Sequence, residues 1–254
     1  MAILSRYELV CIPGTADFVV DELTDKFSNI EILHKNKSVI QFVSEEKDFN
    51  LFANLYSPLK IKDETGNILN LSKREWRKEF VAAGINPSLA YIMCQVANLS
   101  DKDIVYDPFC GASVIPITAL KYFNIKRAIC SDISSKAVYK SKKNFESANI
   151  DESKYKLFKS DISDVQLNKQ NIDRIISNLP FGIRTGNHKG NIIAYYDLEK
   201  LARRLLRKKG LIVVLTQEKT LLREVFRKEF WLVKKVARVN QGGLLPEIFT
   251  ISKK

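Results

Sequence analysis

The chain of 254 residues is poor in the residues that build metal centres and disulfide frameworks. It has four cysteines and two histidines, and the cysteines show neither a CxxC pair nor a regular spacing. Zinc ribbons and disulfide scaffolds need such spacing, so both classes are excluded. His34 and His188 lie far apart in the sequence, which disfavours a histidine-based metal site. Unpaired cysteines indicate a reducing compartment, and we expect a cytoplasmic protein without a bound metal.

Long hydrophobic runs are also lacking. A notable apolar run covers only residues 211–215, against the roughly 18 apolar residues that a membrane helix needs. Arg6 and Glu8 interrupt the first apolar stretch, which predicts a strand there and no signal peptide. Apolar residues nevertheless make up 45% of the chain, so we expect a folded core, no membrane partner, and one large domain with an appendage or two domains.

Acidic charge is scarce in the C-terminal part. Residues 1–104 have 12 Lys and Arg against 15 Asp and Glu, whereas residues 105–254 have 29 against 14. Such an excess attracts polyanions, and nucleic-acid phosphates supply affinity by counterion release. AT-rich coding is an alternative source of lysine, and charge does not distinguish DNA from RNA. Candidates for one RNA-facing patch are Lys136, Lys140, Lys142, Lys143, Arg203, Arg204 and Arg207.

From residue 104 onward, short β-rich runs alternate with helical patterns, which predicts a parallel sheet covered by helices. The predicted strands are residues 104–106, 127–130, 156–158, 174–176 and 211–215. The predicted helices are residues 114–123, 135–147, 193–208 and 218–229. Two last strands, residues 231–239 and 248–252, have only a short joint at 240–243 between them, so they form an antiparallel hairpin at one edge of the sheet.

The N-terminal residues predict a small α+β module over residues 1–72, ahead of a second domain over residues 73–254. The expected elements are a strand at 8–12, a helix at 15–27, a hairpin over 30–42, a helix at 46–55 and a turn at 63–67. A capping-box pattern at 72–75 predicts a short helix after the module. Asn86 and Pro87 predict the start of another, as N-cap and first helical residue.

Polar loops follow four successive predicted strands, at the carboxyl edge where doubly wound sheets bind ligands. In residues 107–113, DPFCGAS, an acid precedes a tight turn and a helix N-terminus that together suit a ligand's carboxylate. Asp132 follows the next strand and suits a ribose diol, although a helix N-cap is an equally good interpretation. Asp161 follows the third strand and suits an adenine amino group.

The fourth loop, NLPFG at 178–182, is the most specific of the four. Asn178 supplies an amide oxygen, Pro180 holds the preceding carbonyl in place, and Phe181 supplies a ring for stacking. These parts orient a planar amino group on a base. A structural turn explains Pro180 and Gly182, but it does not explain Asn178 and Phe181.

The order of these motifs resembles class I S-adenosylmethionine-dependent methyltransferases. Within that class, DPFCG…SD…SD…NLPFG followed by Ile183 and Arg184 is similar to the THUMP-associated RNA guanine-N2 methyltransferases, which modify tRNA and have ribosomal-RNA enzymes as relatives. The resemblance covers about residues 73–254, including Trp76, Arg77 and residues 86–90. It implies a Rossmann-like α/β fold, with a seven-stranded, mostly parallel sheet whose last strand is reversed.

The resemblance also implies roles for individual residues. Those that would hold S-adenosylmethionine are Asp107, Pro108, Phe109, Cys110 and Gly111 at the methionine end, Asp132 and Ile133 at the ribose, Asp161 and Ile162 at the adenine, and Asn178. The implied catalytic residues are Asn178, Leu179, Pro180 and Phe181. The implied substrate-binding residues are Phe181, Gly182 and Arg184. Asn178 and the Leu179 carbonyl would accept hydrogen bonds from the guanine N2 amine while Phe181 stacks on the base.

Two departures from the family pattern matter. Ser113 stands where the family usually has a second glycine, and a left-handed backbone there would cost a serine about 1 kcal/mol. The N-terminal part is short, so we expect a truncated THUMP region, with RNA recognition supplied in part by a protein partner. One alternative is a methyltransferase that acts on ribosomal-RNA guanine. Another is a methyltransferase that acts on adenine N6, and Leu179 disfavours this one. The third is a catalytically silent RNA-binding subunit.

Overall fold

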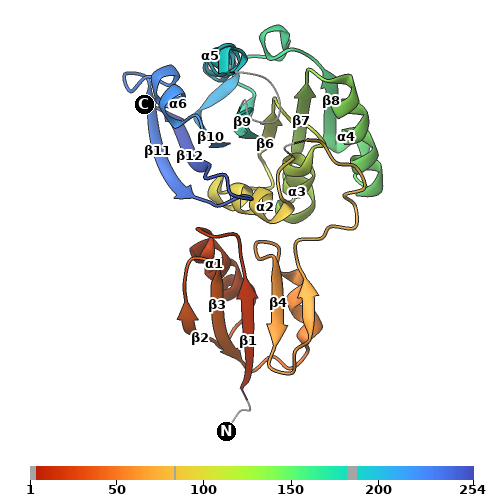
Figure 1. Ribbon diagram of the computed structural model, residues 1–254. Coiled ribbons are helices and arrows are strands. Elements are labelled where there is room, and N and C mark those ends of the chain that lie inside the picture. Colours follow the sequence, from red (N-terminus) through yellow and green to blue (C-terminus); the bar gives the residue numbers. More distant parts are fainter. Residues whose placement is uncertain (1–3, 83, 182–187) are drawn as a thin grey trace.

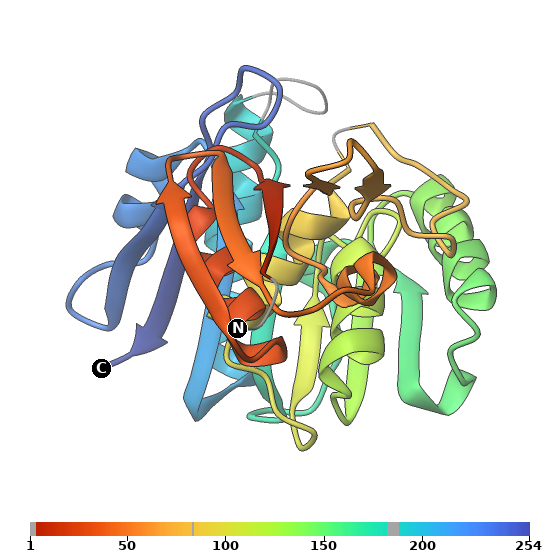
Figure 2. The same ribbon diagram turned by 90° about the horizontal axis from the view of Figure 1, so that it is seen from below.

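The computed structural model describes residues 4–82, 84–181 and 188–254, and it contains two sheets (Figure 1). The smaller sheet has five strands in the order β2-β3-β1-β4-β5, and the larger has seven in the order β11-β12-β10-β9-β6-β7-β8. In Figure 2, seen from below, the small sheet lies in front of the large one. The chain completes the small sheet before it enters the large one, so the two sheets share no strand.

The small sheet is antiparallel and packs against one helix. Its elements are β1 (Ser5–Val10), α1 (Ala16–Lys26), β2 (Ile30–Lys35), β3 (Val39–Ser44), the 3-10 helix η1 (Phe49–Asn54), β4 (Lys60–Asp63) and β5 (Ile68–Asn70). Alternate residues of β3 are buried, among them Ile40 and Phe42, because one face of the sheet covers the core. The predicted first strand, first helix and hairpin are confirmed. The predicted helix at 46–55 is a 3-10 helix, and the turn at 63–67 joins two strands that the sequence did not predict.

The large sheet has the predicted doubly wound arrangement. Its strands are β6 (Ile104–Asp107), β7 (Arg127–Asp132), β8 (Tyr155–Lys159), β9 (Ile172–Asn178), β10 (Leu206–Thr216), β11 (Trp231–Arg238) and β12 (Glu247–Lys253). Its helices are α2 (Pro87–Val96), α3 (Val114–Phe123), α4 (Ser135–Ser147), α5 (His188–Leu205) and α6 (Lys219–Val225), with 3-10 turns η2 (Glu152–Lys154) and η3 (Ile162–Asp164). β12 runs antiparallel to both of its neighbours, β10 and β11, which confirms the reversed last strand and the edge hairpin.

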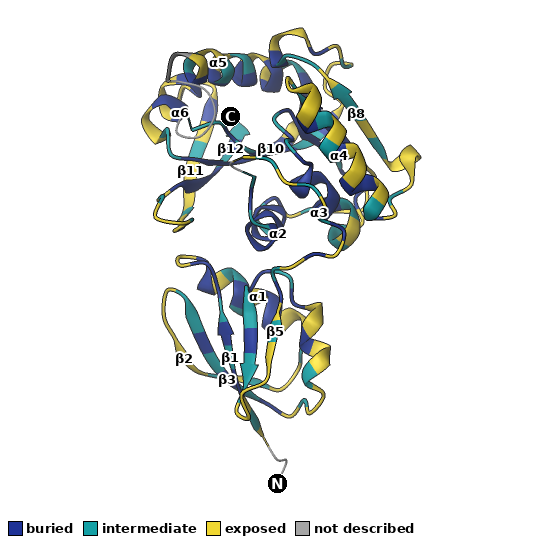
Figure 3. Ribbon diagram, turned by 45° about the vertical axis from the view of Figure 1, so that its right-hand side comes forward, coloured by how far each residue is buried: buried dark blue, intermediate teal, exposed yellow. Residues whose placement is uncertain are grey.

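Helices cover both faces of the large sheet. Leu89 of α2, Ile115 of α3 and Phe145 of α4 belong to one core, whereas α5 and α6 contribute to the core on the other face. Successive residues of β6 face opposite sides, so Val105 enters the first core and Tyr106 the second. Figure 3 shows α2 almost entirely buried, because it lies between the large sheet and the small one.

Hydrogen bonds to proline carbonyls join the N-terminal module to the part of the chain that forms the large sheet. Asn240 N–H donates to the Pro13 carbonyl at 3.0 Å, and the Ser88 hydroxyl donates to the Pro58 carbonyl at 2.8 Å. Gly14 has φ +96°, and a Cβ there would overlap the Arg238 carbonyl oxygen. Glycine is therefore required where the N-terminal module meets the hairpin of the large sheet.

Three predicted helices need correction. The one predicted at 218–229 is shorter, since α6 ends at Val225 and turns follow it. Residues 72–75 do not begin a helix, because Arg74 is buried and donates instead to the carbonyls of Leu71 and Tyr56. The helix predicted at 193–208 ends at Leu205. Leu206 already pairs with β9, and Arg207 forms an ion pair with a β9 residue at 2.5 Å, so tertiary contacts override helix propensity there. The predicted Asn86 cap is confirmed, since its side chain accepts from the Ser88 N–H at 2.8 Å.

Candidate active site

The structure brings the four predicted loops to one edge of the large sheet. Strands β9, β6, β7 and β8 are parallel neighbours, so Asn178, Asp107, Asp132 and the loop of Asp161 follow their carboxyl ends in that spatial order. Asp107 and Asn178 lie on the two strands where the chain order reverses, which is the place where open α/β sheets bind ligands. The edge therefore forms a candidate active site.

Asp107 is the buried acid of this site, with 2% of its surface exposed. Its Oδ1 accepts from the Ser177 hydroxyl at 2.6 Å and from the Phe109 N–H at 3.1 Å. Burial raises the pKa of Asp107 to about 7, because these two donors offset only part of the cost of burying the charge and Asp132 adds a like charge. The carboxyl group is poised to ionise when a cationic ligand group approaches.

The turn after β6 is fixed by the end of β7. Gly111 has φ +54°, and its N–H donates to Oδ2 of Asp132 at 2.9 Å. The other Asp132 oxygen accepts from the Ser134 N–H at 2.9 Å. The N-cap of α4 is Ser134, so the alternative that Asp132 caps this helix is wrong. A carboxylate has about four acceptor positions, which leaves Asp132 capacity for a ribose diol.

The side chains of Pro108, Phe109 and Cys110 in this turn point into the protein and shape its backbone. Pro108 and Cys110 are buried, and Phe109 is partly buried against the core beneath α5. Burial raises the pKa of the Cys110 thiol well above its ordinary value, so it stays protonated and is not a nucleophile at neutral pH. These residues shape the turn, and the groups that it can offer a ligand are backbone ones.

The loop after β8 presents a carboxylate beside Asp132. Asp161 accepts from the N–H and the hydroxyl of Ser163 on its Oδ1, at 2.9 and 3.0 Å. The backbone of this loop is tied to β7, because Ser160 N–H donates to the Asp132 carbonyl at 3.1 Å. Ile162 is buried in the core, whereas Ile133 is 63% exposed, so Ile133 is the apolar side chain of the pair that a ligand can reach.

The segment after β9 holds its backbone rigidly. Leu179 N–H donates to the Leu215 carbonyl at 3.0 Å, and the Pro180 carbonyl accepts from the Tyr195 hydroxyl at 3.3 Å. These two bonds fix the peptide units on either side of the Leu179 carbonyl. Phe181 is partly buried and packs against the core beneath α2 and α3. Gly182 and Arg184 lie outside the described residues.

Ser113 occupies the left-handed conformation that the family's glycine would favour, with φ +57° and ψ +34°. Its side chain is fully buried, and its hydroxyl forms a hydrogen bond with the Ser141 hydroxyl of α4. The serine therefore combines a strained backbone with a bond to the neighbouring helix.

Sequence reasoning missed Asn144, which connects the site to the residues before α2. Its Oδ1 accepts from the N–H groups of Lys78 and Glu79 at 3.0 and 2.9 Å, and its Nδ2 donates to the carbonyls of Glu79 and Ala112. Asn144 is fully buried in the interior of a helix. Asparagine is unfavourable there, and that was the available signal.

The seven predicted basic residues do not form one patch. The four lysines lie on α4, on one face of the sheet, and Arg203 and Arg204 lie on α5, on the other face, because the two helices pack on opposite cores. Arg207 lies in β10. Arg203 and Arg207 are paired with Glu199 and Asp173, at 2.6 and 2.5 Å. Three exposed lysines of α4 form no ion pair with an acid among the described residues, namely Lys136, Lys142 and Lys143.

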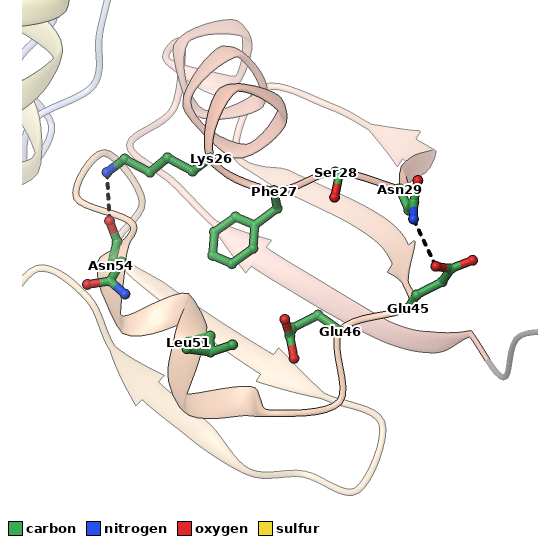
Figure 4. Close-up of a pocket in the computed structure, with 8 residues that line it drawn as sticks. All are labelled: Lys26, Phe27, Ser28, Asn29, Glu45, Glu46, Leu51 and Asn54. Carbon is green, nitrogen blue, oxygen red and sulfur yellow. Dashed lines mark hydrogen bonds between the residues drawn. The ribbon is translucent and has the colours of Figure 1, made fainter.

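An open pocket of about 560 Å³ lies on the N-terminal module (Figure 4). Glu45 and Glu46 line it, and its one ammonium group, from Lys26, is already bound to Glu22 and to the Asn54 carbonyl. Two carboxylates repel a polyanion, so this pocket does not suit a nucleotide.

No helix within residues 4–82, 84–181 and 188–254 combines the length and the apolar character needed to cross a lipid bilayer. The same residues contain no group of three His, Cys, Asp or Glu side chains arranged to hold a metal ion.

Comparison with known proteins gives several matches. A tRNA (guanine(6)-N2)-methyltransferase of Thermus thermophilus is 25% identical over 181 residues, which are 71% of this chain and 53% of that protein. The chain thus spans about half the length of that curated relative. The crystal structure of TrmN from Thermus thermophilus has a TM-score of 0.85 at 15% identity, covering 98% of this chain and all of that one. The structure of SMU.472 complexed with SAH has a TM-score of 0.79 at 15% identity, covering 100% and 99%.

These structural matches show the fold, which is that of α/β class I methyltransferases with an antiparallel C-terminal hairpin. The family model described as "RMKL-like, methyltransferase domain" matches residues 74–247, and that range contains all four loops of the candidate site. The chain belongs to the family of RMKL-like methyltransferase domains.

Proposed function

We propose that this chain transfers a methyl group from S-adenosylmethionine to the exocyclic N2 amine of a guanosine in RNA, with tRNA as the favoured substrate. The observation that supports this most strongly is the rigid segment 178–181, placed beside the Asp107 turn at the reversal point of the sheet. The relative from Thermus thermophilus is named for guanine N2 chemistry on tRNA, which agrees with the proposal.

The site fits S-adenosylmethionine on its own contacts. Asp107 is a buried acid that has two donors among the described residues, which suits an ammonium group, and Gly111 places no side chain at its position in the turn. Asp132 would accept from the ribose hydroxyls and Asp161 from the adenine amine, with Ile133 as the apolar wall, while Ile162 holds the Asp161 loop from the core. When bound, this cofactor supplies a methyl group that its sulfonium charge has already activated.

The chain's own residues position the amine. Asn178 and the Leu179 carbonyl accept from the two N–H groups of guanine N2, and Phe181 stacks on the base. Guanine N2 is conjugated with its ring and is a poor nucleophile, so alignment is the main contribution, capable of about 7–11 kcal/mol in favourable cases. The two acceptors also stabilise positive charge that develops on nitrogen. No general base is needed first, because the proton leaves after transfer.

RNA must present this base unpaired or flipped out of a helix. We propose Gly182 and Arg184 as further contacts to the substrate, and the lysines of α4 as contacts to its phosphates. We further propose residues 73–254 as the methyltransferase domain and residues 1–72 as an accessory module, to which a protein partner with RNA-binding capacity adds recognition.

The test is methyl transfer from labelled S-adenosylmethionine to unmodified total tRNA, followed by digestion to nucleosides. We expect label in N2-methylguanosine, and its loss in Asn178→Ala because one acceptor and its alignment are gone. Asn168→Ala is the matched control, since Asn168 is exposed in the loop before β9. Its activity should equal that of the wild type.

Other outcomes identify the alternatives. Label in N6-methyladenosine would contradict guanine as the target. Label absent from tRNA, with S-adenosylmethionine bound in a calorimetric titration, would move the substrate to ribosomal RNA. No binding of S-adenosylmethionine would support a silent RNA-binding subunit and contradict the proposal.

A further inference from the structure

The segment between the two sheets passes over the proposed cofactor turn. We call residues 73–82 the linking segment; Figure 1 shows this loop running past α4. The Val81 Cγ2 lies 3.2 Å from the position that a Cβ on Gly111 would occupy. Asn144 bonds both to this segment and to the Ala112 carbonyl, so the linking segment and the turn are held against the same side chain. The linking segment is thus one wall of the site.

Arg77 is a half-buried cation in this wall. Its guanidinium carbon lies 4.6 Å from the centre of the Phe80 ring, and Nη2 lies 3.3 Å from the position of a Cβ on Gly84. Its Nε is buried and has no hydrogen-bond partner among the described residues. Burial lowers the pKa of Arg77, with no acidic neighbour to offset it.

No carboxylate neutralises Arg77 in the described part of the chain. Two acids lie two residues from Arg77 in sequence: Glu79 lies 3.7 Å from the Lys140 ammonium instead, and Glu75 is exposed and forms no ion pair with Arg77. The residues outside the description, 1–3, 83 and 182–187, include no Asp or Glu. Elsewhere the half-buried Arg174 has Asp103 at 3.7 Å. An arginine that is partly desolvated without an acid is expected where a ligand brings the anion.

We propose that Arg77 binds the carboxylate of the methionine end of S-adenosylmethionine. This inference rests on the proposed function. The methionine end is a zwitterion, and Asp107 offers the acceptor for its ammonium group but nothing for its carboxylate. The planar guanidinium matches a carboxylate with two parallel hydrogen bonds, and the Phe80 ring restricts its orientation. Arg77 acts as a binding residue and takes no part in proton or methyl movement.

The test compares S-adenosylmethionine with decarboxylated S-adenosylmethionine, which keeps the ammonium and sulfonium groups and lacks only the carboxylate. Affinities are measured by calorimetry with the full chain and without RNA. Arg77→Gln should weaken binding of S-adenosylmethionine about tenfold or more, because charge-assisted hydrogen bonds are lost. It should change binding of the decarboxylated compound by less than about twofold. Arg77→Lys should fall between Gln and wild type.

Arg127→Gln is the matched control, because Arg127 is exposed at the opposite end of β7. It should leave both affinities unchanged. Equal losses for both compounds in Arg77→Gln would overturn the inference by showing a general collapse of the wall. Unchanged affinity for S-adenosylmethionine with weakened tRNA binding would overturn it in favour of a phosphate contact. A wild-type protein that binds S-adenosylmethionine without methylating guanine N2 would contradict the proposed function and leave this comparison intact.

Discussion

Glu22 in the N-terminal module and Asp107 in the large sheet are both 2% exposed, yet their surroundings differ. Glu22 accepts from the N–H groups of Tyr56 and Ser57 at 2.9 and 2.7 Å, from the Ser57 hydroxyl, and from the Lys26 ammonium at 2.6 Å. Within the described part of the chain, Asp107 has two neutral donors, both on Oδ1, and no cation.

The difference separates Glu22, an acid that stabilises the fold, from Asp107, an acid that we propose binds a ligand. Four donors, one of them charged, occupy both oxygens of Glu22 and tie α1 to the chain after η1. The Oδ2 of Asp107 accepts neither of these two hydrogen bonds, and we propose it as the acceptor for the ammonium group of a ligand. The pKa of about 7 means that the fold favours the neutral form of this carboxyl group. Burial alone does not identify a functional carboxylate; the set of donors around it does.

The largest effect is expected at Glu22. Replacing Glu22 with Ala leaves the Tyr56 and Ser57 N–H groups and the Ser57 hydroxyl without their acceptor and removes the partner of the partly exposed Lys26 ammonium. Because each buried donor left unpaired costs about 1–3 kcal/mol, the free energy of unfolding should fall by about 3–5 kcal/mol. Chemical denaturation at pH 7 measures it. Asp25→Ala, on the exposed side of the same helix, should change stability by less than about 0.5 kcal/mol. A loss below 1 kcal/mol at Glu22 would contradict its structural role.

Asp107 should behave in the opposite way, and its effect depends on pH. The folded state raises the pKa of Asp107 from 3.8 to about 7, so the fold prefers the protonated form. The resulting stability is fully present below pH 4 and is lost as pH rises through 7. Asp107→Asn keeps an acceptor at Oδ1 for both donors. It should match the wild type at pH 4 and exceed it above pH 7 by at most about 4 kcal/mol.

Unfolding curves from pH 4 to 8 measure this difference, and parallel curves for the two proteins would contradict it. Binding sharpens the same point. An ammonium group on the ligand favours the ionised carboxylate, so wild-type affinity for S-adenosylmethionine should rise with pH up to about 7. That rise should be absent in Asp107→Asn.

The distinction between satisfied and unsatisfied charge also applies to the basic helices. Replacing Lys136, Lys142 and Lys143 together with Gln should flatten the slope of log affinity for tRNA against log salt by about 2–3, since each phosphate contact contributes about 0.7–0.9. The matched triple replacement of Arg203, Arg204 and Arg207 should change it by less than about 0.5. Those arginines are engaged by Glu199, the Val165 carbonyl and Asp173. Equal salt slopes in the two triple variants would contradict the proposal that the lysines of α4 contact RNA phosphates.

The parts of the site that the sequence predicted follow from strand order. Asp107, Asp132, Asp161 and Asn178 come after short β-rich runs, and parallel strands bring their carboxyl ends to one edge. The linking segment was mispredicted, because its amides are satisfied by Asn144, more than 60 residues away in the sequence. A local capping pattern contains no information about such a contact.

Contacts between distant segments also explain why the sequence did not predict which basic residues are paired and which acids are structural. Composition counted Lys136 and Arg203 alike, but only the packing of α4 and α5 shows which cation is already paired. Glu22 gave no signal of burial on α1, because an i,i+4 pair with Lys26 also suits an exposed helix face and its backbone donors lie more than 30 residues later. Donor sets and ion pairs between distant segments are properties of the fold, whereas the order of the loops is a property of the sequence.

The smallest effect is expected at Ser113, where strain and a satisfied hydroxyl oppose each other. Ser113→Gly relieves a left-handed backbone, worth about 1 kcal/mol, but it leaves the buried Ser141 hydroxyl without this partner, at a cost of about 1–3 kcal/mol. In the wild-type background we therefore expect no gain in stability. In a Ser141→Ala background that cost is absent, and Ser113→Gly should stabilise the protein by about 1 kcal/mol. Denaturant curves for the four proteins give both numbers. A gain only in the alanine background would show that serine is tolerated in the turn because of its bond to α4, whereas equal effects in both backgrounds would show that the two hydroxyls are not coupled.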